Sequence, residues 1–329
     1  MLSPLEGASG AAEKVAPLVK VPVLMRIVVP GFIAVLWLYP LVGLRNSLFS
    51  ISFAEEWRRL VVLVGMTFIL GGATSVLRGT TYKLYEGRAF WPLWLFTRLR
   101  MHQQSRVAKL LAESEKSRSN QVRYDEIWYK LRAYPSDSKG NPFASHPTLL
   151  GNILAAYEDY PWTRYGMDSV FFWPRIWMQL EKEKKDEIDA NWSPADGFLS
   201  ASAVAYCGGL AWLLTAAFGT KELTLLHLAL PFASRYLTAI SSVGFLVLGF
   251  CLYRLSLGFH RGNGETFKSL FDLYRDRLTG MSEIGLKERS KWTKVWAYLQ
   301  YFEVPCEGCG ELIPGNVEYC AKCDRAKAT

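Results

Sequence analysis

Four apolar runs dominate the pattern of hydrophobic and polar positions along the chain. They cover residues 27–44, 60–77, 197–218 and 236–253, and none of them contains an acidic or basic side chain. A helix of eighteen residues is about 27 Å long, close to the roughly 30 Å of a bilayer hydrocarbon core. We therefore predict a mainly α-helical, multi-pass membrane protein with four transmembrane helices.

The first run, residues 27–44, has a competing interpretation as a signal peptide. It is interrupted by Pro30, Gly31, Pro40 and Gly43. However, it is too long for the apolar core of a signal peptide, and no small-residue cleavage site follows it. We interpret it as an uncleaved span.

Polar stretches divide the rest of the chain. Two transmembrane hairpins, residues 27–77 and 197–257, enclose a helical cytosolic domain at residues 78–196. Apolar residues at helical spacing in that domain predict helices over residues 97–119, 148–158 and 178–190. A turn-rich loop is expected at residues 135–142. The remaining parts are a cytosolic N-terminal segment (1–26), a cytosolic helical linker (258–304) and a small C-terminal module (305–329).

The distribution of Lys and Arg sets the expected orientation. Residues 78–109 carry seven basic side chains and one acidic one, whereas the loop between the third and fourth spans has only Lys221 and Arg235 as basic residues. Basic residues collect on the cytoplasmic side of membranes. Both termini and the central segment are therefore predicted to lie in the cytoplasm, with the spans in the inner cell membrane. We attribute the formal charge of +8 to basic residues that face anionic lipid, and we expect no nucleic-acid partner.

Four of the six cysteines form the motif C-x2-C-x10-C-x2-C near the C-terminus. Four thiolates in two such pairs suit a tetrahedral zinc ion with no open coordination position. A disulfide is disfavoured in a reducing cytosol, and an iron–sulfur or redox centre is a further alternative. With its spacing and a Tyr before the third ligand, the motif resembles the short zinc ribbons. That resemblance implies one structural Zn²⁺ on Cys306, Cys309, Cys320 and Cys323.

A second block combines aromatic and charged residues within residues 146–177. It includes the sequence from Tyr157 to Asp168 and the aromatic run from Phe171 to Trp177. The block resembles the cytosolic segment of uncharacterised bacterial multi-pass membrane proteins, which implies a bacterial source and no particular activity. A possible polar cluster comprises Glu158, Asp159, Arg164, Asp168 and Arg175. Such a cluster could perform acid–base chemistry or, as we favour, form a structural ion-pair network. Asn152 and Tyr165 are expected to satisfy backbone groups.

Three classes of function remain after the motifs are considered. The chain has no P-loop and no nucleophile elbow, and charge-free span cores argue against a coupled transporter. The favoured hypothesis is a membrane scaffold or sensor that binds a cytosolic protein through its central domain and zinc ribbon. The first alternative is a homo-oligomeric channel or membrane-perturbing effector, with Thr238, Ser241 and Ser242 as pore-lining candidates. The second is a membrane-interface enzyme, for which no catalytic residue is assigned.

Small residues form stripes on two of the predicted spans. Ala201, Ala205 and Gly209 recur every four residues on the third span, and the second span carries a less regular set, Gly65, Gly71 and Gly72. Small side chains allow close backbone approach between helices in lipid. We expect the second and third spans to pack together within one chain, with a homo-oligomer interface as the alternative.

Overall fold

The computed structural model describes residues 21–41, 56–137, 139–218, 235–275 and 278, and short parts of the C-terminal module: 303–306, 309, 312–314, 319–320, 323 and 325–326. The chain divides into two compact units. Unit 1 comprises Met1–Ala89 and Asp186–His260, and unit 2 comprises Phe90–Lys185 and Arg261–Thr329. The described part is mainly helical, as predicted.

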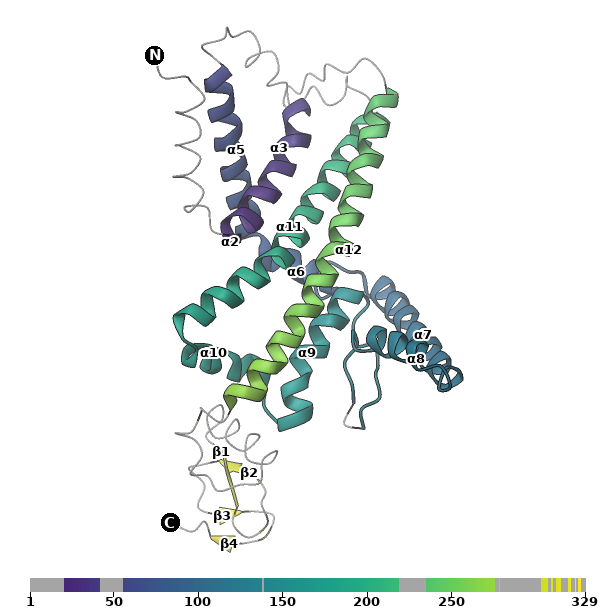
Figure 1. The fold of residues 1–329 in the computed structure, drawn as a ribbon, viewed down its shortest axis with the longest axis vertical. Helices are drawn as coiled ribbons and strands as arrows, with labels where there is room; N and C mark the ends of the chain where they lie inside the picture. Colours follow the sequence, from purple (N-terminus) through teal and green to yellow (C-terminus); the bar gives the residue numbers. More distant parts are fainter. Residues whose placement is uncertain are drawn as a thin grey trace. The chain divides into compact units, whose positions relative to one another are not determined.

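In the part of the chain that the structure describes, three helices are long and apolar enough to cross a membrane. They are Val21–Leu38, Lys182–Ala217 and Thr238–Tyr274, and each contains most of a predicted span. The predicted span at residues 60–77 differs, because it reaches this standard only when Leu60–Val76 is combined with Arg78–Glu86 across a bend of 54°. Unit 1 therefore holds the first candidate span, the bent helix pair and the larger parts of the other two candidate spans (Figure 1). Its elements are α2 (Val21–Val23), η2 (Leu24–Val28), α3 (Val29–Leu41), α5 (Glu56–Val76), α6 (Arg78–Glu86), most of α11 (Lys182–Phe218) and the first part of α12 (Arg235–Tyr274).

The first candidate span begins six residues before the predicted start at Ile27. Its first part contains a single π-helical segment, η2, after which the N–H of Val29 donates to the carbonyl of Leu24. Pro30 follows directly and cannot donate to the carbonyl of Arg26, which explains why the α-helical ladder is interrupted here. The helix therefore includes Arg26, the charged residue directly before the predicted start of the apolar run.

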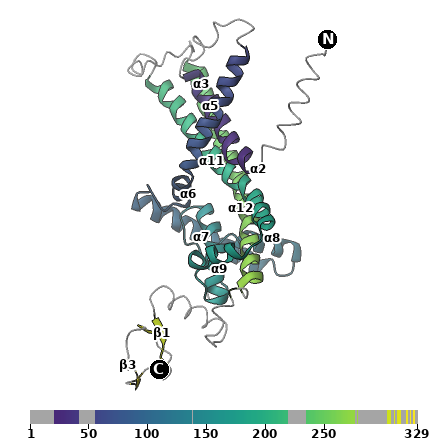
Figure 2. The same cartoon turned by 90° about the vertical axis from the view of Figure 1, so that its left-hand side faces the viewer.

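The core of unit 1 joins α3, α11 and α12. Ile33 and Ala34 of α3 form a buried cluster with Ala201 and Ala205 of α11 and with Leu252 of α12. α5 packs along α3 and η2, and α3, α5 and α11 stay together when the view is turned (Figure 2). The predicted small-residue stripe on α11 is thus buried inside the chain.

Hydroxyl groups and small residues hold α11 and α12 together. Ser202 Oγ donates to the carbonyl of Gly249 over 2.7 Å, and Ser242 Oγ donates to that of Gly209 over 2.8 Å. Ser242, one of the pore-lining candidates, is therefore engaged in a bond between helices. A Cβ atom at Gly209 would lie 2.8 Å from the side chain of Leu246, so the two helices approach closely there.

The two small-residue stripes do not face each other. Gly71 of α5 lies against the backbone of Ile27, whereas Gly209 of α11 lies against Leu246 of α12. A Cβ atom added at Gly65 or Gly72 would meet nothing within 4 Å, so these two glycines border open space on α5. The small residues of the second and third spans were predicted to pack against each other. Instead, Gly71 of the second span contacts the first span, and Gly209 of the third span contacts the fourth.

α11 begins with a charged segment and continues without a break into the apolar run at residues 197–218. It includes Pro194, which leaves the carbonyl of Ala190 without its helical donor. Ser193 Oγ donates to that carbonyl over 2.8 Å and satisfies it. The predicted helix at residues 178–190 is thus divided at Leu180, and its second part is the start of α11.

Unit 2 contains four helices in its described central segment: α7 (Leu93–Lys116), α8 (Gln121–Leu131), α9 (Leu149–Tyr165) and α10 (Ser169–Gln179). α7 and α9 correspond to the predicted helices at residues 97–119 and 148–158. Side-chain caps define three helix starts, because Asn120, Thr148 and Asp168 each accept a hydrogen bond from a backbone N–H in the first turn. The sequence pattern did not reveal α8 and α10.

Asn152 satisfies backbone groups, as expected. It is fully buried, and its Oδ1 accepts from the N–H groups of Ser145 and His146. Its Nδ2 donates to the carbonyls of His146 and Thr148. One side chain therefore fixes the segment that leads into α9. The predicted linker at residues 258–304 begins as α12, and residues 276–277 and 279–302 lie outside the described part of the chain.

Gly209→Leu should destabilise the helix pair of α11 and α12. The new side chain would meet Leu246, and overpacking of this kind costs about 1–3 kcal/mol. Thermal unfolding in detergent should show a lower midpoint, with no change in the mass measured by light scattering. Gly65→Leu is the matched control, since its Cβ would meet nothing within 4 Å. A smaller assembly for Gly209→Leu would instead make this surface an oligomer interface.

Candidate metal centre and buried charge clusters

Among the described residues of the C-terminal module, two short antiparallel strand pairs lie next to the cysteines. β1 (Glu303–Pro305) pairs with β2 (Leu312–Pro314), with Val304 opposite Ile313. β3 (Tyr319–Cys320) pairs with β4 (Arg325–Ala326). Cys306 directly follows β1, and Cys323 lies between β3 and β4, so each strand pair positions one cysteine of the cluster. Cys320, the predicted fourth ligand, ends β3, and its side chain falls outside what the structure describes.

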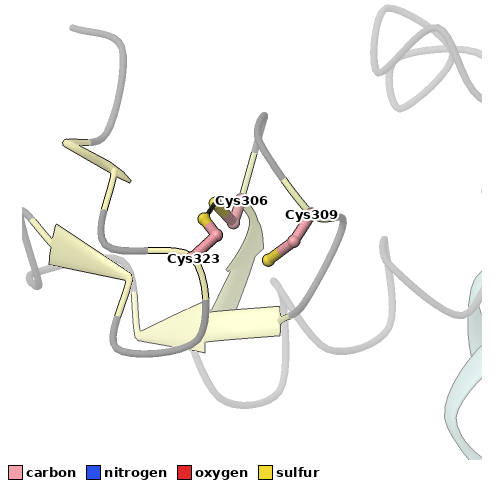
Figure 3. A group of neighbouring side chains, drawn as sticks. All are labelled: Cys306, Cys309 and Cys323. Carbon is pink, nitrogen blue, oxygen red and sulfur yellow. Dashed lines mark hydrogen bonds between the residues drawn. The ribbon is translucent and has the colours of Figure 1, made fainter.

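Three cysteine sulfurs gather in one place. The Sγ atoms of Cys306, Cys309 and Cys323 all lie within 4.8 Å of one another (Figure 3). Cys306 Sγ and Cys323 Sγ are 3.4 Å apart, which is too far for a disulfide bond of about 2.05 Å. Ligands about 2.3 Å from a tetrahedral zinc ion are separated by about 3.8 Å. The three thiols therefore fit a metal ion, with Cys306 buried, Cys323 half-buried and Cys309 exposed.

The possible polar cluster of the central segment is spread over α9 and α10. Asp168 caps α10 by accepting from the N–H of Phe171 over 2.7 Å. Arg175 donates to the carbonyl of Phe171 over 2.6 Å, and its guanidinium lies 3.7 Å from the centroid of that ring. Arg164 is exposed in the last turn of α9. The contacts of Asp168 and Arg175 thus stabilise the start of one helix.

Glu158 and Asp159 occupy consecutive positions in the second half of α9. The side chain of Glu158 is half-buried, whereas that of Asp159 is exposed. Both positions precede Pro161, which lies inside the helix.

Asp272 of α12 is an acceptor that sequence reasoning missed. Tyr165 Oη donates to it over 2.6 Å, and Tyr160 Oη donates over 3.0 Å. Burial, followed by the hydrogen bond to Asp272, raises the pKa of both tyrosines, so both remain protonated donors. Arg275 lies over the Tyr165 ring at 4.3 Å from its centroid. Tyr165, expected to satisfy a backbone group, therefore helps to join α9 to α12.

A second charge cluster, in unit 1, surrounds Asp196. Arg26 Nε donates to Asp196 over 2.6 Å, and another guanidinium nitrogen of Arg26 donates to Asp189 over 2.5 Å. Arg78 and Tyr82 of α6 also donate to Asp196, over 3.1 and 2.6 Å. One carboxylate thus receives donors from η2 and from α6. Its side chain is 14% exposed and that of Arg26 is 18% exposed, so this is a largely buried ion pair.

Three residues of this second cluster directly flank predicted spans. Arg26 precedes residue 27, Arg78 follows residue 77, and Asp196 precedes residue 197. Opposite charges at the ends of three apolar runs are a signal that could have indicated the cluster. Tyr82 also contacts His260, with ring centroids 5.5 Å apart and an edge-to-face angle of 85°.

Comparison of the chain with protein-family models, curated proteins and solved structures finds no match.

Proposed function

We propose that this chain is a membrane-anchored scaffold or sensor that binds a cytosolic protein through its central segment and its C-terminal metal module. The observation that carries this proposal is the form of α11 and α12. Each is one unbroken helix, of 37 and 40 residues, and each joins an apolar span to a charged segment. A helix that continues from lipid into the aqueous phase couples a membrane anchor to the residues that contact a partner.

The proposal includes α5 and α6 as a fourth, bent span. In support of this, α5 exposes a band of large apolar side chains, including Leu60, Val61, Val64 and Ile69, as expected for a helix that faces lipid. The excess of basic residues at 78–109 supports a cytoplasmic location for the central segment and both termini, in an inner cell membrane.

The metal in this proposal is one structural Zn²⁺ per chain. Cys306, Cys309 and Cys323 supply three thiolates, and Cys320 supplies the fourth by its place in the C-x2-C pair. Thiolate-rich tetrahedral sites favour zinc, and a site closed by four thiolates has no position for a substrate. When bound, zinc supplies folding energy to a module too small to build a core of its own.

Photo-crosslinking in intact cells tests the partner proposal. A photoreactive residue is placed at Val122 and at Val170, which are 81% and 77% exposed in unit 2. Leu210, 53% exposed on the apolar part of α11, is the matched control. We expect one adduct of the same additional mass from Val122 or Val170, formed with a cytosolic protein and absent at Leu210.

Three outcomes would count against the proposal. An adduct with a protein from the outer side of the membrane would contradict the orientation. Adducts only with a second copy of the chain, together with ion flux from reconstituted vesicles, would favour the homo-oligomeric channel. A complete absence of protein adducts at both exposed positions would contradict the scaffold function.

A further inference from the structure

A small cavity lies within unit 2, where α8 and α9 meet the second part of α12. Its volume is about 190 Å³. Tyr129 and Arg132 line it from α8 and the residue after it, Tyr157 from α9, and Arg261, Glu265 and Lys268 from α12. Pockets for drug-sized ligands occupy about 300–1,000 Å³. The cavity therefore suits a smaller group, of the size of a phosphate or pyrophosphate.

The lining of this cavity is cationic. It contains three basic residues and one acidic residue, and Lys268 pairs with Glu265 over 3.0 Å. Among the residues that the structure describes, no carboxylate forms an ion pair with Arg132 or Arg261. Two guanidinium groups thus face one cavity without a neutralising partner. Arg132 is exposed and Arg261 is half-buried, and a cleft lined by charges of one sign concentrates counter-ions, so this excess of positive charge favours an anion.

Arg261 carries the strongest evidence. Its Nε is buried and has no hydrogen-bond partner within the described part of the chain. Its guanidinium lies 5.5 Å from the centroid of the Tyr129 ring, which orients the planar group against an aromatic wall. The Arg261 guanidinium therefore lacks a full set of acceptors among the described residues, although the side chain lines the cavity.

Another part of the cavity lining, around Tyr157, is closely packed. The ring of Tyr157 lies so near Gly264 that a Cβ there would be 2.7 Å from Tyr157 Cδ1. The same ring packs on Phe267, with centroids 5.2 Å apart. Tyr157 therefore has little freedom to collapse into the cavity.

We propose that this cavity binds a small phosphate-bearing anion, with Arg261 and Arg132 as its principal ligands. Guanidinium groups bind phosphate oxygens through paired, charge-assisted hydrogen bonds, and they match this geometry better than a point charge does. The anion is either a free phosphate compound or the phosphate of a lipid headgroup, because the recognised chemistry is the same. The proposal goes beyond the scaffold function and does not depend on the protein partner.

Thermal unfolding of the full chain in a neutral detergent tests the free-phosphate source. Inorganic phosphate and inorganic pyrophosphate are titrated at constant ionic strength, with chloride as the reference anion. We expect a saturable rise in the unfolding midpoint, as for any ligand that binds only the folded state. Arg261→Gln should weaken the apparent affinity about tenfold or more, since it removes charged hydrogen-bond donors.

Two further variants make the result specific. Arg118→Gln is the matched control, because Arg118 is 70% exposed and lies outside the cavity, and it should leave the affinity unchanged. Glu265→Gln removes the carboxylate of the lining and should tighten binding. Because the affinity should rise in Glu265→Gln and fall in Arg261→Gln, the proposal can be tested even if Arg261→Gln fails to fold.

Nanodiscs test the lipid source. Stability is compared in phosphatidylcholine alone and in phosphatidylcholine with part of the lipid replaced by phosphatidic acid. Stabilisation only by phosphatidic acid, lost in Arg261→Gln and kept in Arg118→Gln, would identify a headgroup site. The proposal is overturned if neither phosphate nor phosphatidic acid stabilises the chain, or if Arg118→Gln weakens binding as much as Arg261→Gln.

Discussion

Cys323→Ser should abolish zinc binding and unfold the C-terminal module, while the helices of both units keep their structure. Cys323 Sγ lies 3.4 Å from Cys306 Sγ at the centre of the thiol cluster, so its loss removes a ligand from the site. Structural zinc contributes about 10–16 kcal/mol of apparent binding energy in small modules, and this energy is what folds them. The two strand pairs are only two or three residues long, so we expect the module to depend on a bound metal for its stability.

Elemental analysis and circular dichroism of the purified chain measure this result. The unaltered chain should contain one zinc per molecule, and Cys323→Ser should contain none, with almost unchanged helical signal. Cys207→Ser is the matched control, because Cys207 is an exposed free thiol on α11, away from the motif. Zinc retained in Cys323→Ser, or iron in the unaltered chain, would contradict the assignment.

The apolar runs could be predicted because the information is local. Residues 197–218 and 236–253 are free of charged side chains, and each lies largely within a helix that qualifies as a membrane span. Hydropathy says less about where such helices begin. Arg26 directly precedes the first apolar run and was left outside the predicted span. In the structure it lies inside a helix, because Asp189 and Asp196 neutralise its charge. Those partners are more than 160 residues away in the sequence, beyond the reach of any local pattern.

The local sequence also failed to predict that α11 is one continuous helix. Pro194 favours a helix end, and it lies between the predicted helix at residues 178–190 and the predicted span at residues 197–218. The structure retains one helix because Ser193 satisfies the carbonyl that Pro194 leaves free. α10 was missed for a related reason, since Pro174 lies inside it and its residues are mostly apolar on both sides of the proline.

The candidate sites differ in how far the sequence defines them. The cysteine motif is a contiguous pattern with fixed spacing, and three of its four members are found together. The cavity of unit 2 instead combines Arg132 with Arg261 and Lys268, which no spacing connects. Similarly, Tyr160 and Tyr165 meet Asp272 only because α9 packs against α12. Such sites depend on tertiary packing, so no local pattern in the sequence indicates where they lie.

Asp196→Ala should lower the free energy of unfolding by about 3 kcal/mol, the second large effect that we expect. Removing one partner of a buried ion pair leaves an uncompensated charge, and this typically costs about 3–5 kcal/mol. We place the value at the lower end because Arg26 keeps Asp189, whose side chain is 45% exposed. Arg78 is 38% exposed and can be solvated after the change. The measurement is thermal or denaturant-induced unfolding in detergent.

A surface ion pair of similar geometry provides the control. Glu115 and Arg118 are 2.8 Å apart, but their side chains are 63% and 70% exposed. Glu115→Ala should therefore change the free energy of unfolding by less than about 1 kcal/mol. An equal effect of the two substitutions would show that burial of Asp196 has no energetic consequence.

A double substitution separates the cost of a stranded charge from the value of the pair. Arg26→Met combined with Asp196→Ala removes both charges, while methionine retains the apolar stem that packs along the helix. If the penalty arises from the unpaired guanidinium, the double variant should regain at least half of the stability lost in Asp196→Ala. Additive losses would instead mean that Arg26 contributes independently, through its bond to Asp189. The cluster would then consist of two separate ion pairs rather than one network centred on Asp196.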